Sequence, residues 1–437
     1  MLKAQPKRNS YKSYKKCNAA WVDNIPSHWK VVPLKHSLRL ISDKKSTLVS
    51  SLSYLGMENI ESHTGKLIQA GSEAEGLANR YSPGDILFGR LRPYLAKVAL
   101  ADSEGLCSTE LLVYRPQSGD PRFLKHTLAS KQFISLVNSS TYGSKMPRAS
   151  ADFIGSQKIL VPPLREQLAI SEFIENKTSQ ISEGIHAKEQ QISRLKERKQ
   201  ILIQKAVTRG LDSNAPMQDS GIEWIGEIPK HWGVSHNRTL FTERVEPGKE
   251  GLPLLTVSIR SGVSTGELSE DDNLRGRVKI EDQTKYSLVH PGDIVYNMMR
   301  AWQGAIGAVT TTGMVSPAYT VATPDSRIRP KYFEYLYRTP LFIHQMDRHS
   351  KGITDFRKRL YWQEFKQMLT LLPPLDEQDR IVRHIDQEST RIDRAISLFH
   401  DQIERLKEYR ATLIDSAVTG RIRVPGVEDP ARKEAMA

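Results

Sequence analysis

The chain has 437 residues, a formal net charge of +13 and 38% hydrophobic residues. This apolar content is enough for packed cores and excludes a disordered chain. Two cysteines, Cys17 and Cys107, exclude a disulfide framework and fit a reducing cytoplasm, and no apolar run approaches the ~20 residues of a membrane span. The basic surplus favours a polyanionic partner, nucleic acid ahead of an anionic membrane, although a merely soluble basic protein fits it as well.

Residues 1–17 are predicted to form a basic flexible tail. Six basic residues precede Asp23, the first acid of the chain. No apolar stretch follows them, so this segment is not a signal peptide. The composition fits an arm that contacts DNA phosphates, and equally an arm without contacts.

From residue 18 onward the chain contains one pattern twice. The segment W-V-D-N-I-P-S-H-W at 21–29 recurs as W-I-G-E-I-P-K-H-W at 224–232. Three further motifs recur in the same order. They are P-G-D-I at 83–86 and 291–294, P-P-L-x-E-Q at 162–167 and 373–378, and R-L-K-E at 194–197 and 405–408. This period is far longer than the ~20–50 residues of a solenoid repeat. We therefore expect two globular domains, each followed by a long helix: a first domain at 18–163, a central spacer helix at 164–213, a second domain at 214–374, and a C-terminal helix and tail at 375–437.

Each globular domain is predicted to be α+β. The segments at 21–29 and 224–232 are the opening segments of the two domains, and we expect each to form an ordered loop. Their tryptophans are better explained as buried core residues than as a platform for base stacking. We expect His28 and His231, which lie in these segments, to be structural. Each P-G-D turn leads into a short apolar run, as a turn before a half-buried strand does. A helical stretch follows near residues 120–137 and 330–346.

Two long helices are indicated by a heptad-like apolar pattern, and each spans roughly 65 Å. A helix of this kind cannot bury its apolar stripe alone. A second chain would serve as partner, but two such helices in one chain favour an intramolecular antiparallel coiled coil and a pseudo-twofold repeat. Thr178, Lys188 and Lys199 interrupt the seam and leave room for a third helix from another protein. The seam residues are Ile174, Ile181, Ile185, Ile192, Leu195, Leu202 and Ala206, and Ile385, Ile392, Ile396, Ile403, Leu406, Leu413 and Ala417.

No catalytic constellation is present in the sequence. It contains no G-x-G-x-x-G, G-x-x-x-x-G-K-[ST], H-E-x-x-H or C-x-x-C motif. His344 and His349 are five positions apart and would not share a helix face well, so no metal site is expected. Both Pro-Pro pairs precede leucine, whereas an adenine methyltransferase motif requires an aromatic residue there. We expect a chain without catalytic residues.

The whole architecture resembles the specificity subunit of a type I restriction-modification enzyme. The resemblance covers residues 18–424 and rests on the duplicated W-x-x-x-I-P-x-H-W, P-G-D-I and P-P-L-x-E-Q motifs and on the L-K-E and A-V-T endings of both helices. It implies two target recognition domains that each read one half of a split, asymmetric DNA site and direct adenine methylation or cleavage by partner subunits. It also implies that the helices dock two modification subunits, that restriction subunits join this core, and that S-adenosylmethionine, ATP and Mg belong to the partners.

The candidate DNA-contacting residues lie after each P-G-D strand and in a Ser/Gly/Lys loop further along each domain. Arginine reads guanine and asparagine or glutamine reads adenine, while lysine and arginine also contact phosphates. These positions differ between the copies while their surroundings match, as two readers of different half-sites require; for any one arginine, a solvated surface charge is the alternative. The candidates are Arg90, Arg92, Tyr94, Lys97, Ser144, Lys145 and Arg148 in the first domain, and Asn297, Arg300, Trp302, Gln303, Lys351, Thr354 and Arg357 in the second.

Two other functions fit parts of the pattern. One is a structural scaffold built on the helical hairpin. The other is a nuclease or methyltransferase with a degenerate site, acting alone. Gel shifts of the lone chain, and of the chain with a modification subunit, discriminate among the three.

Overall fold

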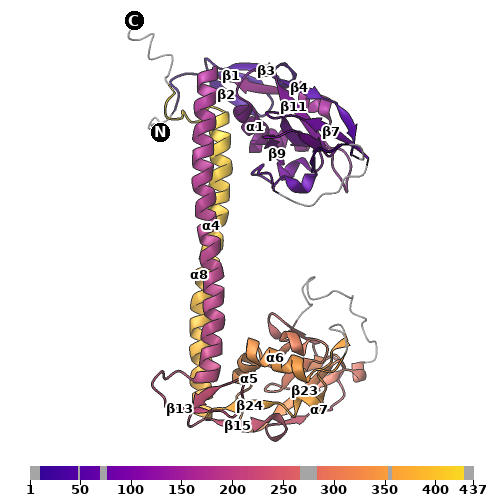
Figure 1. The fold of residues 1–437 in the computed structure, drawn as a ribbon, viewed down its shortest axis with the longest axis vertical. Coiled ribbons are helices and arrows are strands. Elements are labelled where there is room, and N and C mark those ends of the chain that lie inside the picture. The colour runs from indigo at the N-terminus through magenta and orange to yellow at the C-terminus, as the bar shows by residue number, and fades with distance from the viewer. Residues whose placement is uncertain (1–9, 48–49, 69–75, 266–282, 353–356, 428–437) are drawn as a thin grey trace. The chain divides into compact units, whose positions relative to one another are not determined.

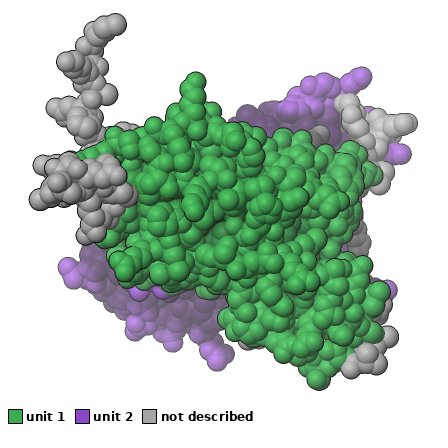
Figure 2. All heavy atoms as spheres, turned by 90° about the horizontal axis from the view of Figure 1, so that it is seen from above, with its two compact units in different colours: residues 1–188, 400–437 green, residues 189–399 purple. Residues whose placement is uncertain are grey.

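The computed structural model describes residues 10–47, 50–68, 76–265, 283–352 and 357–427 (Figure 1). The chain divides into two compact units, coloured separately in Figure 2. Unit 1 comprises residues 1–188 and 400–437, and unit 2 comprises residues 189–399. None of the described helices combines the length and the apolarity that crossing a bilayer requires.

Unit 1 is built on two four-stranded sheets and three short helices. The first sheet has the order β4-β11-β8-β9 and the second has the order β5-β7-β10-β6. Helix α1 packs on strands β8 and β9 of the first sheet. The strands of the two sheets are β4 (Leu38–Ile41), β11 (Leu111–Pro116), β8 (Ile86–Gly89), β9 (Val98–Leu100), β5 (Lys44–Ser46), β7 (Leu77–Tyr81), β10 (Gly105–Cys107) and β6 (Tyr54–Leu55). The helices are α1 (Pro121–Ala129), α2 (Lys131–Ser139) and α3 (Ala151–Ser156).

Unit 2 repeats the first of these sheets in the order β16-β23-β20-β21. Two antiparallel strand pairs, β17-β18 and β19-β22, accompany it. Its strands are β16 (Phe241–Glu243), β23 (Tyr319–Pro324), β20 (Ile294–Asn297), β21 (Ile306–Ala308), β17 (Leu255–Ser258), β18 (Gly262–Thr265), β19 (Ser287–Val289) and β22 (Gly313–Val315). Its helices are α5 (Pro330–Tyr337), α6 (Pro340–His349) and α7 (Trp362–Phe365). The α+β prediction and both predicted helical stretches are thereby confirmed.

Each sheet core is joined to the long helices by two further strand pairs. In unit 1 they are β1 (Tyr14–Ala19) with β2 (Val22–Pro26), and β3 (Lys30–Pro33) with β12 (Lys158–Val161). In unit 2 they are β13 (Met217–Asp219) with β14 (Glu227–Pro229), and β15 (Gly233–His236) with β24 (Leu369–Leu372).

The P-G-D motif forms the turn before the central strand of each sheet. Its glycine has a positive φ in both copies, and its aspartate is buried. The Asp85 carboxylate accepts two hydrogen bonds of 2.7 Å from Arg115, on the neighbouring strand β11. Asp293 accepts bonds of 3.0 and 3.2 Å from Arg244, which follows β16 instead. The same buried charge is therefore satisfied by arginines from different strands.

A buried glutamate at the head of α4 (Leu164–Arg209) fastens the opening segment of unit 1 to this helix. Glu166 accepts hydrogen bonds from Trp29 Nε1 at 3.1 Å and from His28 Nε2 at 2.8 Å. The Tyr11 hydroxyl donates to the same carboxylate. Trp29 is fully buried, so the predictions of a core tryptophan and a structural histidine are confirmed.

Unit 2 repeats this junction at the head of α8 (Leu375–Val418). Glu377 accepts hydrogen bonds from Trp232 Nε1 at 3.0 Å and from His231 Nε2 at 2.7 Å. The glutamine that follows each glutamate makes a second attachment. Gln167 accepts the backbone N–H of Asp120 at 2.9 Å, just before α1, and Gln378 accepts that of Arg329 at 2.8 Å, just before α5.

The prediction of a flexible tail over residues 1–17 is wrong for its second half. Residues 14–19 form β1, which pairs with β2. Tyr11 is only 4% exposed, because its ring packs against His28 and Trp29 while its hydroxyl binds Glu166. Residues 1–9 lie outside the described part of the chain.

The two long helices pair antiparallel within each unit. In unit 1 the head of α4 and the end of α8 share one core, and further along α4 the Lys188 ammonium donates to Gln402 at 2.5 Å. In unit 2 Lys199 pairs with Asp393 at 2.7 Å, and the end of α4 reaches the junction of α8. The predicted antiparallel coiled coil is confirmed. Lys188 and Lys199 are used between the helices, so they do not by themselves indicate space for a third helix.

Glycine at 420 is predicted to be required by close packing as well as by its backbone angle. Gly420 has φ +71°, and a Cβ there would lie 2.5 Å from Pro26 Cδ. Gly426 has φ +85° with no atom within 4 Å of a built Cβ. Both G420A and G426A incur roughly 1–2 kcal/mol of backbone strain, and G420A adds about 1–3 kcal/mol of overpacking. Thermal unfolding should show the larger loss of Tm for G420A; equal losses would contradict the packing argument.

Candidate nucleic-acid interface

The two predicted segments of unit 1 form one continuous surface. Residues 90–97 follow strand β8 and contain the short 3-10 helix η4 (Pro93–Leu95), whereas residues 142–148 lie between α2 and α3. The Arg92 N–H donates to the Pro147 carbonyl at 2.7 Å, and the Ala149 N–H donates to the Arg90 carbonyl at 3.0 Å. Segments that are about fifty positions apart in the sequence are thus held together by their backbones.

The arginines at the centre of this surface have protein partners. Arg90 Nη2 donates to the Tyr142 hydroxyl at 3.1 Å, while its buried Nε has no partner among the described residues. Arg148 makes a bidentate ion pair with Glu110, at 2.9 Å from Nε and 2.7 Å from Nη2. Hydrogen bonding to this carboxylate raises the pKa of Arg148. Glu110 was not among the predicted residues. The one sequence feature that could have indicated it is its position as an acidic residue between two basic segments. Arg90, Glu110 and Arg148 line a surface hollow together with Ser42, Lys44 and Asn79.

The remaining candidates of unit 1 differ in how available they are. The Lys97 ammonium donates to the Met57 carbonyl at 2.6 Å, so its charge is directed into the protein. Four candidates are exposed: Arg92, Tyr94, Ser144 and Lys145.

Unit 2 brings its two predicted segments together in the same way. Residues 297–303 follow strand β20 and include the 3-10 helix η7 (Ala301–Gln303), which packs against α6. The Leu360 N–H donates to the Met298 carbonyl at 2.9 Å, and the backbones of Lys351 and Arg359 pair at 2.8 Å. The loop after α6 therefore folds back onto the loop after β20.

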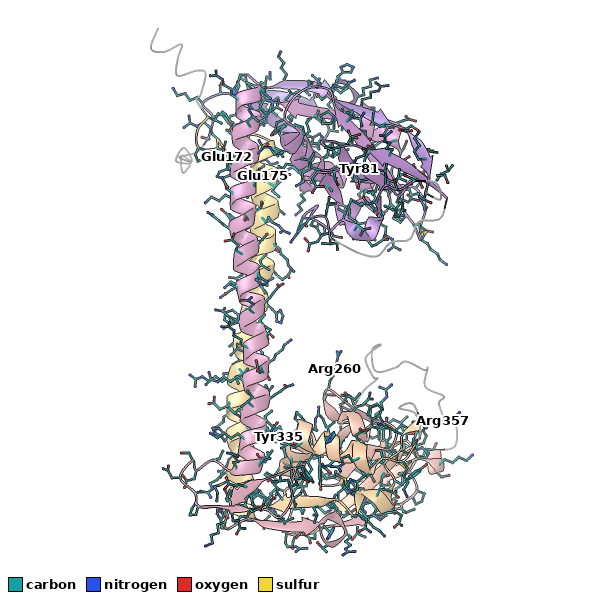
Figure 3. The ribbon with its side chains drawn as sticks, in the orientation of Figure 1. Tyr81, Glu172, Glu175, Arg260, Tyr335 and Arg357 are labelled. Carbon is teal, nitrogen blue, oxygen red and sulfur yellow. The ribbon has the colours of Figure 1, made fainter. Side chains whose placement is uncertain are left out.

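The side chains of unit 2 present a more aromatic surface. Trp302 is half-buried, donates from Nε1 to the Met299 carbonyl at 2.9 Å, and lies under the Lys358 ammonium, 5.2 Å from its ring centre. Asn297 is buried and its Oδ1 accepts the Met299 N–H at 2.9 Å. Lys351 is paired with Glu364. Arg300 is half-buried, and Gln303 and Arg357 are exposed; Arg357 is labelled in Figure 3. Thr354 lies outside the described residues.

The described residues contain no group of three or more His, Cys, Asp or Glu side chains placed to hold a metal ion. Burial raises the pKa of the Cys107 thiol to about 12, so this cysteine stays protonated at neutral pH. The candidate segments themselves supply arginine, lysine, amide and aromatic groups, which suit hydrogen bonding and stacking to nucleic acid.

Comparisons of the sequence with known proteins find type I restriction enzyme specificity subunits. The sequence model of the type I restriction modification DNA specificity domain matches residues 26–194. The type I restriction enzyme EcoBI specificity subunit of Escherichia coli is 24% identical over 368 residues, 78% of this chain and 74% of that protein. The EcoKI specificity subunit of Escherichia coli strain K12 is 23% identical over 323 residues, 69% of this chain and 65% of that protein.

Solved structures share the fold over most of the chain. A structure described as the basis of complex assembly and conformational transition of the type I R-M system has a TM-score of 0.67 at 17% identity, covering 91% of this chain and 99% of the other. The HsdS subunit from Thermoanaerobacter tengcongensis has a TM-score of 0.51 at 17% identity, with coverages of 91% and 98%. Taken together, the sequence and structure matches make the chain similar to the specificity subunits of type I restriction-modification systems.

In unit 1, Arg92 is predicted to contribute to DNA binding and Lys97 to the stability of the fold. Because Arg92 is exposed, R92Q should weaken DNA binding by roughly 5- to 150-fold and leave thermal unfolding unchanged. Because Lys97 is bonded to the Met57 carbonyl, K97Q should lower Tm and leave binding nearly intact. Gel shifts of the full chain with duplex DNA, together with thermal melts, separate the two effects. If K97Q weakened binding as much as R92Q without lowering Tm, this assignment would be wrong.

Proposed function

We propose that this chain is the non-catalytic DNA-reading subunit of a type I restriction-modification complex, in which each unit reads one half of a bipartite, asymmetric site. One observation carries the proposal. In both units a segment after the central P-G-D strand is joined by backbone hydrogen bonds to a second, distant segment. The framework is the same in both units while the side chains on it differ, which suits two readers of different sequences.

The chemistry of the two surfaces supports different half-sites. Unit 1 presents Arg92, Lys145 and the Arg90–Tyr142 pair, and arginine is the usual donor to guanine O6 and N7. Unit 2 presents Arg300, Gln303 and the Trp302 ring under Lys358. Glutamine suits adenine, and the cationic groups of both units attract phosphates.

The long helices support the proposed docking of two modification subunits. Several apolar side chains on them are exposed although the helices pair with each other, and exposed apolar side chains are typical of surfaces that bind another protein. These residues are Leu164, Leu168, Ile201, Leu398 and Tyr409. In this proposal restriction subunits join the same core, S-adenosylmethionine, ATP and Mg are bound by the partners, and the complex acts on DNA in the cytoplasm.

Exchange of one reading region between related proteins tests the proposal. We would replace residues 34–156, which lie between β3 and β12, with the matching region of a relative, so that the Glu166 junction and the strand pair beside it stay intact. The methylated sequence in cells that carry the complex should change in one half only. The matched exchange of residues 237–366, between β15 and β24, should change the other half.

Sequencing of methylated sites reads out both exchanges. A change in both halves after either exchange would show that the two units do not read independently. An active complex whose methylated sequence is unchanged by both exchanges would show that these regions do not select the sequence.

A further inference from the structure

A short turn in unit 2 joins β17 to β18 and holds an exposed arginine. It comprises residues 258–262 and is called the Arg260 turn below. Arg260 is exposed, and Figure 3 shows its side chain pointing outward from the ribbon of unit 2. The turn lies outside both of the segments that the sequence pattern selects. Its backbone is nevertheless fixed from three sides.

The turn is first restrained by its own residues. The Ser258 hydroxyl is buried and accepts the N–H of Arg260 at 3.0 Å and the N–H of Ser261 at 3.1 Å. Gly262 has φ +69°, which glycine adopts without strain. A Cβ at Gly262 would lie 2.7 Å from Arg338 Nη1 and 3.1 Å from Glu334 Oε1. The turn therefore rests directly on a charged pair.

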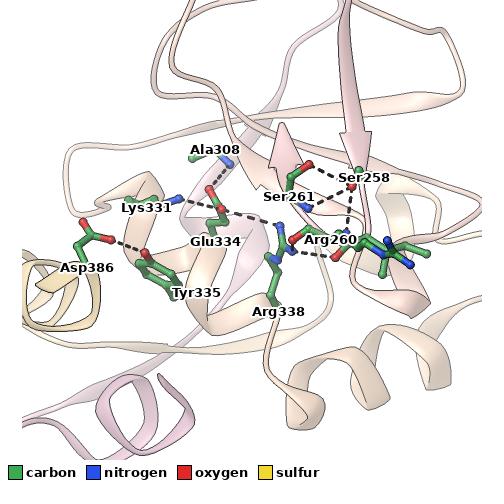
Figure 4. A network of polar contacts seen from close by, with 10 residues as sticks. Ser258, Arg260, Ser261, Ala308, Lys331, Glu334, Tyr335, Arg338 and Asp386 are labelled. Carbon is green, nitrogen blue, oxygen red and sulfur yellow. Dashed lines mark hydrogen bonds and ion pairs between the residues drawn. The ribbon is translucent and has the colours of Figure 1, made fainter. Parts of the chain in front are cut away.

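This pair clamps the turn to the helix α5 region (Figure 4). Arg338 Nη2 donates to the carbonyls of Ile259, at 2.8 Å, and of Arg260, at 2.5 Å. Glu334 accepts the Ala308 N–H of β21 at 3.0 Å and also pairs with Lys331 at 2.9 Å. The Arg338 and Glu334 side chains are only 20% and 9% exposed.

Burying such a pair stabilises a fold little or not at all compared with apolar residues of similar size. Burial lowers the pKa of Arg338, and the Glu334 charge opposes this shift. The pair does, however, fix the position of the backbone that it contacts. Its cost is thus better explained by accurate placement of the backbone that carries Arg260 than by stability.

The Arg260 turn adjoins the candidate surface of unit 2. A Cβ at Gly307 would lie 2.7 Å from the Val263 N and 3.0 Å from the Gly262 Cα, so β21 and the turn are in close contact. The candidate loop 297–303 leads along the chain directly into strand β21. The turn and the loop therefore both adjoin β21.

Unit 1 also has a turn that contacts its candidate loop, and this turn carries a histidine. The His63 N–H, in the turn of residues 61–66, donates to the Leu95 carbonyl of the candidate loop at 3.0 Å. Its Gly65 also has a positive φ, of 66°. A histidine in one unit and an arginine in the other fit elements that face different sequences.

We infer that Arg260 is a third DNA-contacting element of unit 2, donating to an acceptor in the half-site of that unit, and that Arg338 is its positioning residue. This inference rests on the proposed function. The acceptors within the reach of a guanidinium are the guanine edge and the phosphate oxygens.

The test compares R260Q with R238Q in the full complex. Arg238 is an exposed arginine of the same unit, on the 3-10 helix η5 (Asn237–Thr239) that leads into β16, at the opposite edge of the sheet from β21. Methylated sites and DNA affinity at several salt concentrations are measured for both variants. For a guanine contact, R260Q lowers the preference at one base pair of the unit 2 half by about 5- to 150-fold. For a phosphate contact, R260Q weakens all sequences equally and lowers the salt slope by about 0.9.

The role of Arg338 is tested separately with the R338Q variant. R338Q should affect the same base pair or the same salt slope as R260Q, and the double variant should lose no more than R260Q alone. A purely structural Arg338 would lower Tm without this effect. R260Q that binds and methylates like R238Q would overturn the inference. That result leaves the two-reader proposal intact, because the unaltered complex would still methylate a bipartite site.

Discussion

The burial of one carboxylate at the head of each long helix is the constraint on which the rest of the structure depends. Glu166 and Glu377 are nearly inaccessible to solvent, and a buried charge is costly unless several donors satisfy it. In each unit a tryptophan and a histidine of the opening segment supply those donors. The opening segment therefore cannot move away from the helix without exposing an unsatisfied charge, and the sheet that follows it is fixed to the helix end.

The glutamine beside each glutamate extends this attachment to the far side of the reading unit. Gln167 and Gln378 bind the backbone immediately before α1 and α5. Two adjacent residues thus hold both the first and the later part of a unit to one helix turn. With the framework fixed in this way, the loops after the central strand and before the last strand are free to differ in sequence. This division allows one framework to carry two surfaces with different side chains.

Most of the framework could be predicted from the sequence because its motifs occur twice in the same order. The helix seam, the turn before each central strand and the core tryptophans all have local signals, namely heptad spacing, P-G-D and paired motifs. The partner of each motif had no such signal. Nothing local shows that W-x-x-x-I-P-x-H-W binds the glutamate of P-P-L-x-E-Q, since the two are more than a hundred positions apart.

The candidate site was predicted less completely, for physical reasons. Charge and residue type select Arg90, Lys97 and Arg148 equally, but only the fold shows that Lys97 is bonded to a carbonyl and Arg148 to Glu110. Basic composition likewise indicated a flexible tail, whereas Tyr11 is held by the buried Glu166. No local sequence pattern indicates the Arg260 turn, because the residues that restrain it, Arg338 and Glu334, are distant in sequence.

The central claim is that two separate surfaces of one chain select two separate blocks of DNA sequence. Sequencing of modified bases in cells that carry the intact complex tests it most directly. The account predicts a methylated site with two specified blocks separated by a gap of unspecified base pairs. A methylated site that is one uninterrupted block, or a single block repeated as a palindrome, would contradict it.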